Sequence, residues 1–178
     1  KKNNLKIIKI KKSKIKGGSI RIYSKKIDSV KLYSENIVVK NLLQKEKILG
    51  FHNFNKLKKI NIKYEIYKRN VISFLKNLKK NKYKIFGYGA AAGATTILHF
   101  FKMNNYIDSI IDDNPIRENL YSPGYRIKIC SPKKIYSDKP DYIFIFAWRY
   151  ADRILKKNNK FKKNGGKFII PLPNLKII

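Results

Sequence analysis

The chain has 178 residues, enough for one domain or for one domain with part of a second. Its net charge of +31 would suit nucleic acid, but the lysines are spread along the whole chain without a groove-reading helix, so we expect no specific nucleic-acid partner. The single cysteine, Cys130, excludes an internal disulfide framework and a cysteine zinc cluster, and it favours a cytoplasmic location. No apolar run approaches the length of a membrane span, and the lysine-rich start lacks the apolar core of a signal peptide, so we expect no membrane partner.

The first part of the chain predicts two strands followed by two helices. Stretches rich in isoleucine favour strands, and asparagine or glycine bounds each helix. The elements expected here are strands over residues 5–10 and 19–23, a turn at Gly17–Gly18, a polar linker over residues 25–36, and helices from Glu35 or Asn36 to about Leu49 and from about Asn53 to Lys80. The glycine turn is typical of a hairpin or bulge, although it could also contact a ligand. The longer helix carries an apolar stripe, which indicates a core face or, alternatively, a groove for a partner protein.

The stretch from Tyr83 to Phe101 organises the rest of the chain. An apolar run, a turn of small residues over 87–94 and an amphipathic run from Thr95 predict strand, turn and helix, the opening unit of a Rossmann-type fold. Glycines allow the backbone to approach a ligand closely, and the N–H groups at a helix start suit an anion. The spacing departs from G-x-G-x-x-G because Ala92 takes the third position, so close packing of helix and sheet is the alternative. The candidate substrate-binding residues of the turn are Gly87, Tyr88, Gly89, Ala90 and Ala91.

Two further side chains have both a functional and a structural interpretation. Asp112 follows the predicted strand over 106–111, where a dinucleotide fold holds a ribose hydroxyl with an acidic residue. The alternative is a turn or a helix cap, because the sequence Asp-Asp-Asn-Pro favours a turn. His99 could act as an acid or a base, but the sequence shows no orienting partner nearby, and a packed structural role is the alternative.

The remaining residues continue the alternation of strands and helices. The expected elements are a loop over 116–126, strands over 126–129, 140–147 and 167–171, and helices over 131–136 and 150–160. Trp148 and Arg149 follow the most apolar strand, on the ligand side of a parallel sheet, and would suit a phosphate or a base, although Trp148 could instead cap the core. The pattern predicts an α/β fold: a Rossmann-like, open, mostly parallel sheet of four or five strands with flanking helices, preceded by two N-terminal strands and two helices.

Several motifs of the chain occur in a characteristic order. They are Gly87-Tyr88-Gly89-Ala90-Ala91-Ala92, Asp112-Asp113-Asn114-Pro115, Ser122-Pro123-Gly124, Pro140-Asp141-Tyr142, Ala147-Trp148 and Gly165-Gly166-Lys167-Phe168-Ile169-Ile170-Pro171-Leu172-Pro173. In this order they resemble the C-terminal domain of the sugar C-methyltransferases, which act on nucleotide-activated deoxysugars. Residues 17–23 resemble the last strand of that family's central methyltransferase domain. The resemblance implies that residues 1–34 end the central domain and that residues 35–178 form the C-terminal Rossmann-like domain.

The resemblance also implies a function. Family members combine a zinc domain with four cysteines, a central domain that binds S-adenosylmethionine, and this C-terminal domain. The chain would then be part of an S-adenosylmethionine-dependent methyltransferase, contributing to substrate binding and domain packing and inactive alone. Its partners would be the missing domains, which bind the cofactor, and a nucleotide-activated sugar held by residues 87–91, Asp112, Trp148 and Arg149. No cofactor, catalytic residue or metal ligand is expected on this chain.

The chain departs from the family pattern at one place, and its function has an alternative interpretation. Family members usually continue the turn with Lys-Gly, whereas this chain has Gly93-Ala94, so no contact by that lysine is carried over. The alternative function is a free-standing module that binds a nucleotide or a sugar nucleotide without methyltransferase activity.

Overall fold

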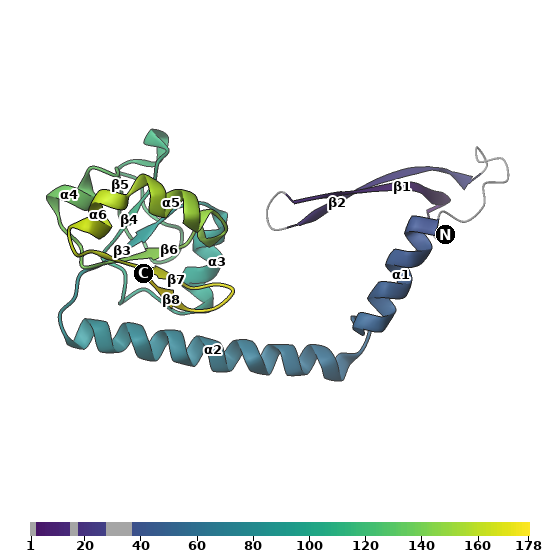
Figure 1. The fold of residues 1–178 in the computed structure, drawn as a ribbon, viewed down its shortest axis with the longest axis horizontal. Helices are drawn as coiled ribbons and strands as arrows, with labels where there is room; N and C mark the ends of the chain where they lie inside the picture. The colour runs from purple at the N-terminus through teal and green to yellow at the C-terminus, as the bar shows by residue number, and fades with distance from the viewer. Residues whose placement is uncertain (1–2, 15–17, 28–36) are drawn as a thin grey trace. The chain divides into compact units, whose positions relative to one another are not determined.

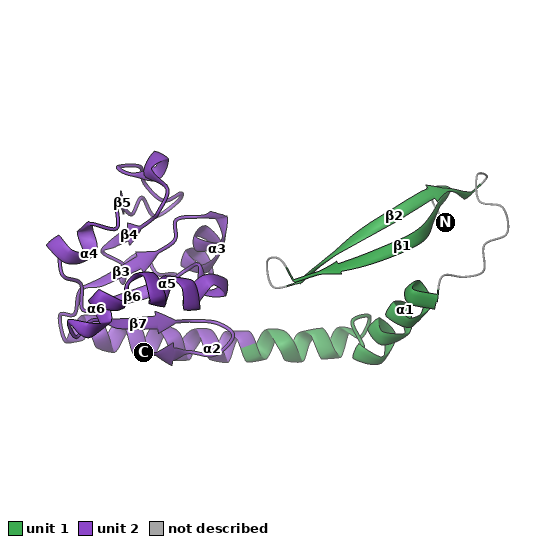
Figure 2. Cartoon of the chain, turned by 45° about the horizontal axis from the view of Figure 1, so that its top comes forward, with its two compact units in different colours: residues 1–63 green, residues 64–178 purple. Residues whose placement is uncertain are grey.

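The computed structural model describes residues 3–14, 18–27 and 37–178. The chain divides into two compact units, residues 1–63 and residues 64–178 (Figure 1, Figure 2). Part of the predicted glycine turn, most of the predicted linker and the predicted first residues of the next helix lie outside the described residues. The domain boundary expected after residue 34 also falls there and stays a prediction.

The described part of the first unit contains a strand pair, a helix and the beginning of a second, longer helix. β1 (Leu5–Ser13) and β2 (Ser19–Lys26) pair antiparallel, and both extend beyond the stretches that isoleucine content predicted. α1 (Ile37–Leu49) ends at Gly50, whose φ of +66° is left-handed backbone that favours glycine. None of the described residues of 1–63 is buried, so the described part of this unit contains no core of its own.

The long helix α2 (Phe54–Lys80) begins close to its predicted start and ends at its predicted end. Asn53 caps its first turn, since the Asn53 side-chain oxygen accepts a hydrogen bond from the Lys56 amide at 3.2 Å. In its second half the apolar stripe is buried, at Val71, Leu75 and Leu78. The second half of the stripe is therefore a core face of the second unit, as the structural alternative predicted.

Residues 64–178, all of which are described, contain a six-stranded sheet. Its strands are β3 (Ile85–Tyr88), β4 (Ser109–Ile111), β5 (Ile129–Cys130), β6 (Tyr142–Ile145), β7 (Lys167–Ile170) and β8 (Lys176–Ile177). They lie in the order β5-β4-β3-β6-β7-β8, with parallel pairing everywhere except between β7 and β8. This is the strand order of the doubly wound nucleotide-binding fold, and it confirms the predicted open, mostly parallel α/β sheet.

Helices cover both faces of this sheet (Figure 1). The second half of α2 and α3 (Ala92–Phe100) share one apolar cluster with Phe144 of β6. The helices α4 (Lys134–Ser137), α5 (Ala151–Lys157) and α6 (Asn159–Lys163) share a second cluster with Ile143 and Ile145. Successive strand residues point to opposite faces, so a strand buried on both faces is apolar throughout. Among the helices of the described residues, none is long and apolar enough to cross a membrane.

Three local features differ from the predictions. The turn after β3 is shorter than expected, because α3 begins at Ala92, and alanine favours a helix. The helix predicted over 150–160 is broken into α5 and α6 at Asn158, a buried residue whose side chain donates a hydrogen bond to the Ile154 carbonyl at 2.9 Å. The antiparallel edge strand β8 was not predicted at all, since two residues carry too little pattern.

Candidate functional site

The order of the strands in the sheet reverses between the central neighbours β3 and β6. Ligands of such folds bind outside the carboxyl ends of the strands at this point. A cavity of about 490 Å³ opens there. Its lining comes from the ends of β3, β4 and β6, from the loop after β4 and from α5, and consists of Tyr88, Gly89, Ala91, Asp112, Asp113, Arg117, Ala147, Tyr150, Arg153, Ile154 and Lys157.

The glycines at the end of β3 allow close approach of the neighbouring strand. A Cβ at Gly87 would overlap the ring of Phe146, and a Cβ at Gly89 would lie 2.8 Å from the Cβ of Ala147. Gly89 also has a φ of +96°, which side-chain-bearing residues rarely adopt. Close packing therefore accounts for both glycines, and their contact with a ligand stays a prediction.

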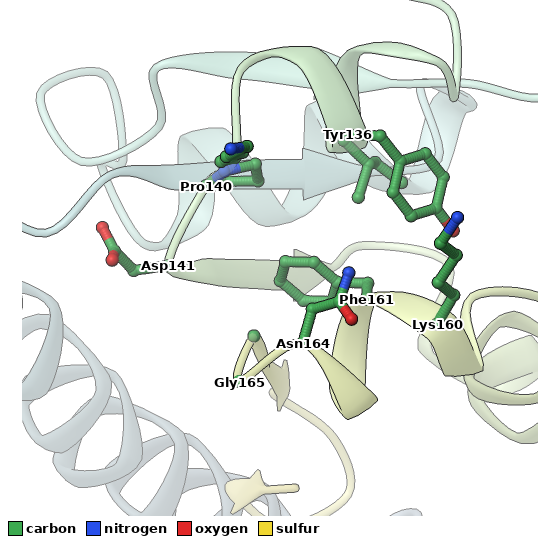
Figure 3. A pocket seen from close by; sticks show the side chains of 10 residues that line it. Tyr136, Pro140, Asp141, Lys160, Phe161, Asn164 and Gly165 are labelled. Carbon is green, nitrogen blue, oxygen red and sulfur yellow. The ribbon is translucent and has the colours of Figure 1, made fainter.

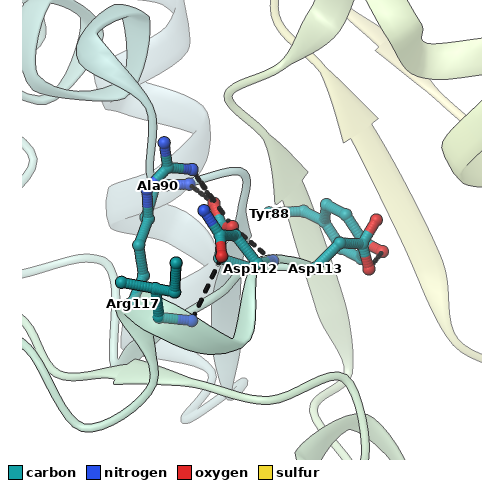
Figure 4. Close-up of polar contacts among 7 residues, drawn as sticks. Tyr88, Ala90, Asp112, Asp113 and Arg117 are labelled. Carbon is teal, nitrogen blue, oxygen red and sulfur yellow. Dashed lines mark hydrogen bonds and ion pairs between the residues drawn. The ribbon is translucent and has the colours of Figure 1, made fainter.

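Asp112 lies at the centre of a hydrogen-bond cluster at the end of β4 (Figure 4). Its Oδ2 atom accepts a hydrogen bond from the Ala90 amide at 2.6 Å, and its Oδ1 atom accepts one from the Asn114 amide at 2.8 Å. The Nη1 atom of Arg117 lies 3.2 Å from Oδ1 and 3.1 Å from Oδ2. The carboxylate, only 7% exposed, thus ties the glycine-rich turn to the loop after β4.

A second polar cluster joins β3 to α5 across the cavity. The hydroxyl of Tyr88 donates a hydrogen bond to Asp113 at 2.8 Å, and the ammonium of Lys157 donates one to the same oxygen at 2.6 Å. Burial raises the pKa of Tyr88 above its usual range, against a lowering by a hydrogen bond with Asn158, so its hydroxyl stays protonated at neutral pH. Burial alone would raise the pKa of Asp113, but hydrogen bonds from Lys157 and Tyr88 outweigh it and hold that pKa below its usual range.

The structure brings only some of the sequence-predicted site residues together. Tyr88, Gly89, Ala91 and Asp112 line the cavity, and Ala90 lies beside it through its bond to Asp112. Trp148 and Arg149 follow β6, as expected, but they belong to the 3₁₀ helix η4 (Trp148–Tyr150) and are not among the lining residues. The Arg149 guanidinium stacks 4.4 Å from the Trp148 ring, and Trp148 packs against both apolar clusters. The packing alternative for Trp148 therefore accounts for its place.

Sequence reasoning missed the cationic part of the lining. Arg117 lies in η3 (Pro115–Arg117), which the sequence suggested only as an irregular loop. Arg153 and Lys157 lie one helical turn apart on α5 and share a face with Tyr150. A signal was present, because a helix that follows a parallel strand starts beside the carboxyl edge of the sheet, where i, i+4 cations can face a ligand.

His99 lies outside this cavity, in the last turn of α3. Its ring stacks on the ring of Tyr125, with 4.4 Å between the centroids and 19° between the planes. A Cβ at Gly124 would overlap the His99 ring, so the loop and the histidine are packed tightly together. These contacts favour the structural role for His99.

A second cavity, of about 580 Å³, lies near the amino ends of β6 and β7, and Figure 3 shows side chains that line it. Tyr136 of α4 and Lys160 of α6 line it, together with Pro140, Asp141 and Gly165 near the starts of β6 and β7. The Lys160 ammonium lies 5.7 Å from the centre of the Tyr136 ring. None of the predicted site residues lines this cavity, and the described residues contain no group of His, Cys, Asp or Glu side chains that could hold a metal ion.

Comparison with known proteins identifies relatives of this chain. The C-methyltransferase NovU of Streptomyces niveus is 23% identical over 177 residues, which are 99% of this chain and 42% of the relative. The chain thus spans less than half the length of that relative. Among solved structures, UDP-D-quinovosamine 4-dehydrogenase from Vibrio fischeri superposes with a TM-score of 0.40 and 15% identity, over 54% of this chain and 93% of that chain.

A family match covers most of the chain. Residues 14–173 match the family described as C-methyltransferase C-terminal domain. The match confirms the resemblance predicted from the ordered motifs. The chain belongs to the family of C-methyltransferase C-terminal domains.

Proposed function

We propose that this chain is the C-terminal part of an S-adenosylmethionine-dependent C-methyltransferase that acts on a nucleotide-activated sugar. In this proposal the cavity at the carboxyl ends of β3, β4 and β6 holds the nucleotide part of the substrate. One observation carries the proposal: Arg117, Arg153 and Lys157 line a cavity placed where doubly wound folds bind ligands. Guanidinium and ammonium groups form strong, charge-assisted hydrogen bonds with phosphate oxygens.

The same lining does not fit the methyl donor. S-adenosylmethionine carries a positively charged sulfonium, and the cations of the cavity would repel it. The lining contains three cations and two carboxylates, and both carboxylates, Asp112 and Asp113, are held in ion pairs with Arg117 and Lys157, so neither is left unpaired to attract the sulfonium. We therefore assign the donor to a part of the enzyme outside this chain, as the family resemblance implies for the donor and for the zinc ion.

The role of the chain in the reaction is to bind and orient the sugar. In outline, a base removes a proton next to a keto group of the sugar, and the resulting carbanion attacks the donor methyl group and displaces the thioether. The resemblance assigns this base to the central domain, and the two aspartates of the cavity are held in ion pairs with Arg117 and Lys157.

Isothermal titration at moderate salt tests the proposal. We expect the purified chain to bind a dTDP-deoxysugar and not S-adenosylmethionine. The substitution Arg153→Gln should weaken binding by about tenfold, because it removes a charge-assisted contact to phosphate. Lys160→Gln is the matched control, since it removes the same charge at the opposite cavity and should leave binding unchanged.

Other outcomes would count against the proposal. Binding of neither compound would remove the substrate site from this chain, and equal losses in the two variants would indicate unspecific attraction to a basic protein. The alternative, a free-standing sugar-nucleotide module, is distinguished by the coding sequence that adjoins this chain. A reading frame with four spaced cysteines and an S-adenosylmethionine-binding motif supports the methyltransferase, and its absence supports the module.

A further inference from the structure

The acidic residue at the end of the second sheet strand has a well-known task in dinucleotide folds, where it accepts a hydrogen bond from a ribose hydroxyl. Asp112 occupies this place in the chain, directly after β4. To hold a ribose it would need a lone pair that is open to the cavity. The positions of its partners decide whether it has one.

The carboxylate of Asp112 has its acceptor sites occupied from inside the protein. A carboxylate offers about four lone-pair sites on its two oxygens. Oδ1 accepts from the Asn114 amide and from Arg117, and Oδ2 accepts from the Ala90 amide and from Arg117, all within 3.2 Å. Because the side chain is also 7% exposed, an incoming hydroxyl would have to displace a backbone or guanidinium donor.

The partners of Asp112 are themselves parts of the proposed site. Ala90 belongs to the glycine-rich turn, and Arg117 lines the cavity. A guanidinium carries five N–H donors, and both hydrogen bonds from Arg117 to Asp112 come from Nη1. Donors on the other nitrogens of Arg117 remain for a group of the ligand that accepts hydrogen bonds.

We propose that Asp112 is a positioning residue that fixes the Ala90 amide and the Arg117 guanidinium, and that the cavity recognises an anionic group of its ligand through Arg117 and not a ribose through Asp112. This assignment rests on the proposed function and specifies which part of the nucleotide the cavity recognises. The site then distinguishes ligands by their phosphates and does not distinguish ribose from deoxyribose.

The positioning role is tested without any ligand, by amide hydrogen exchange measured by NMR on the whole chain. In Asp112→Ala, exchange of the Ala90 amide should accelerate by about tenfold or more, since it loses a charge-assisted acceptor. Asp112→Asn keeps an acceptor oxygen and should restore part of the protection. Asp152→Ala, which removes a carboxylate from the exposed side of α5, is the control and should leave Ala90 unchanged.

Unchanged exchange at Ala90 in Asp112→Ala, with β6 amides still protected, would overturn the positioning role. If Asp112→Ala does not fold, the positioning role of Asp112 is tested with the more conservative variant Asp112→Asn. Its Ala90 amide should resonate at a shifted position, because the acceptor has lost its charge, and an unshifted resonance would overturn the role equally.

Ligand recognition is tested by titration with uridine diphosphate and with 2′,3′-dideoxyuridine diphosphate. We expect dissociation constants within about threefold of each other, and a loss of about tenfold for both in Arg117→Gln. A dideoxy compound that binds at least about tenfold more weakly, with the difference lost in Asp112→Asn, would show that Asp112 holds the ribose after all. If neither compound binds, the nucleotide site and the Arg117 role are refuted, while the Ala90 exchange still decides the role of Asp112.

Discussion

The two units of the chain use similar apolar residues in opposite ways. Residues 64–178 bury them on both faces of a sheet, in two clusters that include Leu75, Phe144 and Phe168. In the described part of residues 1–63 no residue is buried, and large apolar side chains such as Leu43 and Ile48 are exposed. Both units carry many lysines, so charge does not distinguish them.

The difference shows that apolar content alone does not make a core. The inner strands β3 and β6 of the second unit are buried along their whole length, and helices that cover both faces of the sheet remove them from water. The helix α1 has apolar residues, and none of its residues is buried. Such a surface fits the proposed packing of this unit against the remainder of a methyltransferase, where the exposed residues would be covered.

The largest expected effect is that of truncating a buried leucine of the second unit, which is compared with an exposed leucine of the first unit. Leu75→Ala removes a fully buried side chain and should lower the free energy of unfolding by about 2–5 kcal/mol, because it leaves a cavity. Leu43→Ala, at a side chain that is 61% exposed, should change it by less than about 0.5 kcal/mol. Urea unfolding followed by circular dichroism measures both. Equal losses of unfolding free energy would mean that α1 is packed as firmly as the second half of α2. The two units would then not differ in the way that the structure indicates.

Two glycines of the second unit differ in the space around them, one lying in tight packing and the other in open space. Gly87→Ala places a methyl group against the Phe146 ring and should cost about 1–3 kcal/mol through overpacking. Gly93→Ala meets no atom within 4 Å and lies inside α3, so it should stabilise the protein by about 0.5–1 kcal/mol. Thermal melting of both variants checks the opposite signs. A neutral Gly87→Ala would show that the sheet accommodates a side chain where the structure leaves no room.

Tyr67 of the second unit carries a buried polar group that is not hydrogen-bonded to any described residue. Among the described residues its hydroxyl oxygen is buried without a hydrogen-bond partner, beside the ring of Phe101. Tyr67→Phe removes the unsatisfied group and should stabilise the chain by about 1 kcal/mol. Tyr64→Phe, at an exposed position on the same helix, is the control and should have no effect. A destabilised Tyr67→Phe would reveal a partner for the hydroxyl, for example a bound water.

The same residue predicts a dependence on alkaline pH. Burial raises the pKa of Tyr67 from 10.0 to about 12. The hydroxyl is neutral in both states below pH 10, whereas between pH 10 and 12 the unfolded chain ionises first, so stability falls in this window. Tyr67→Phe should therefore gain most over the wild type there, in urea titrations repeated at rising pH. A gain that does not grow with pH would contradict the burial of the hydroxyl.

The smallest expected effect lies on the surface of the second unit. Lys157 and Asp113 form an ion pair in which the side chains are 52% and 46% exposed, so Lys157→Gln should cost only about 0–1 kcal/mol. The lowered pKa of Asp113 contributes stability at neutral pH that is lost as the pH falls through that pKa. The difference between variant and wild type should vanish in acid, which denaturant titrations can follow. A difference that persists at a pH well below the lowered pKa of Asp113, where the carboxyl is protonated in the folded state as well, would assign the effect to packing of the lysine stem.

The sequence predicted part of the candidate site. Tyr88, Gly89 and Asp112 lie at the carboxyl edge as expected, because Tyr88 ends β3, Gly89 and Asp112 directly follow β3 and β4, and parallel strands end at one edge. The same rule brought Trp148 and Arg149 to this edge, but the chain turns at once into η4 and stacks the two side chains on each other. The rule fixes where a strand ends and does not fix where the next side chains point.

By itself, the sequence determined the alternation of elements, the mostly parallel sheet and the family, because these follow from local periodicity, turn residues and ordered motifs. Only the tertiary structure decided that Asp112 bonds to Ala90 and Arg117, that Arg153 and Lys157 face the cavity, and that Asn158 breaks the last helix. Periodicity reports neighbours within a few residues. The contact between Ala90 and Asp112 joins positions 22 residues apart, and it exists only because β3 and β4 lie side by side.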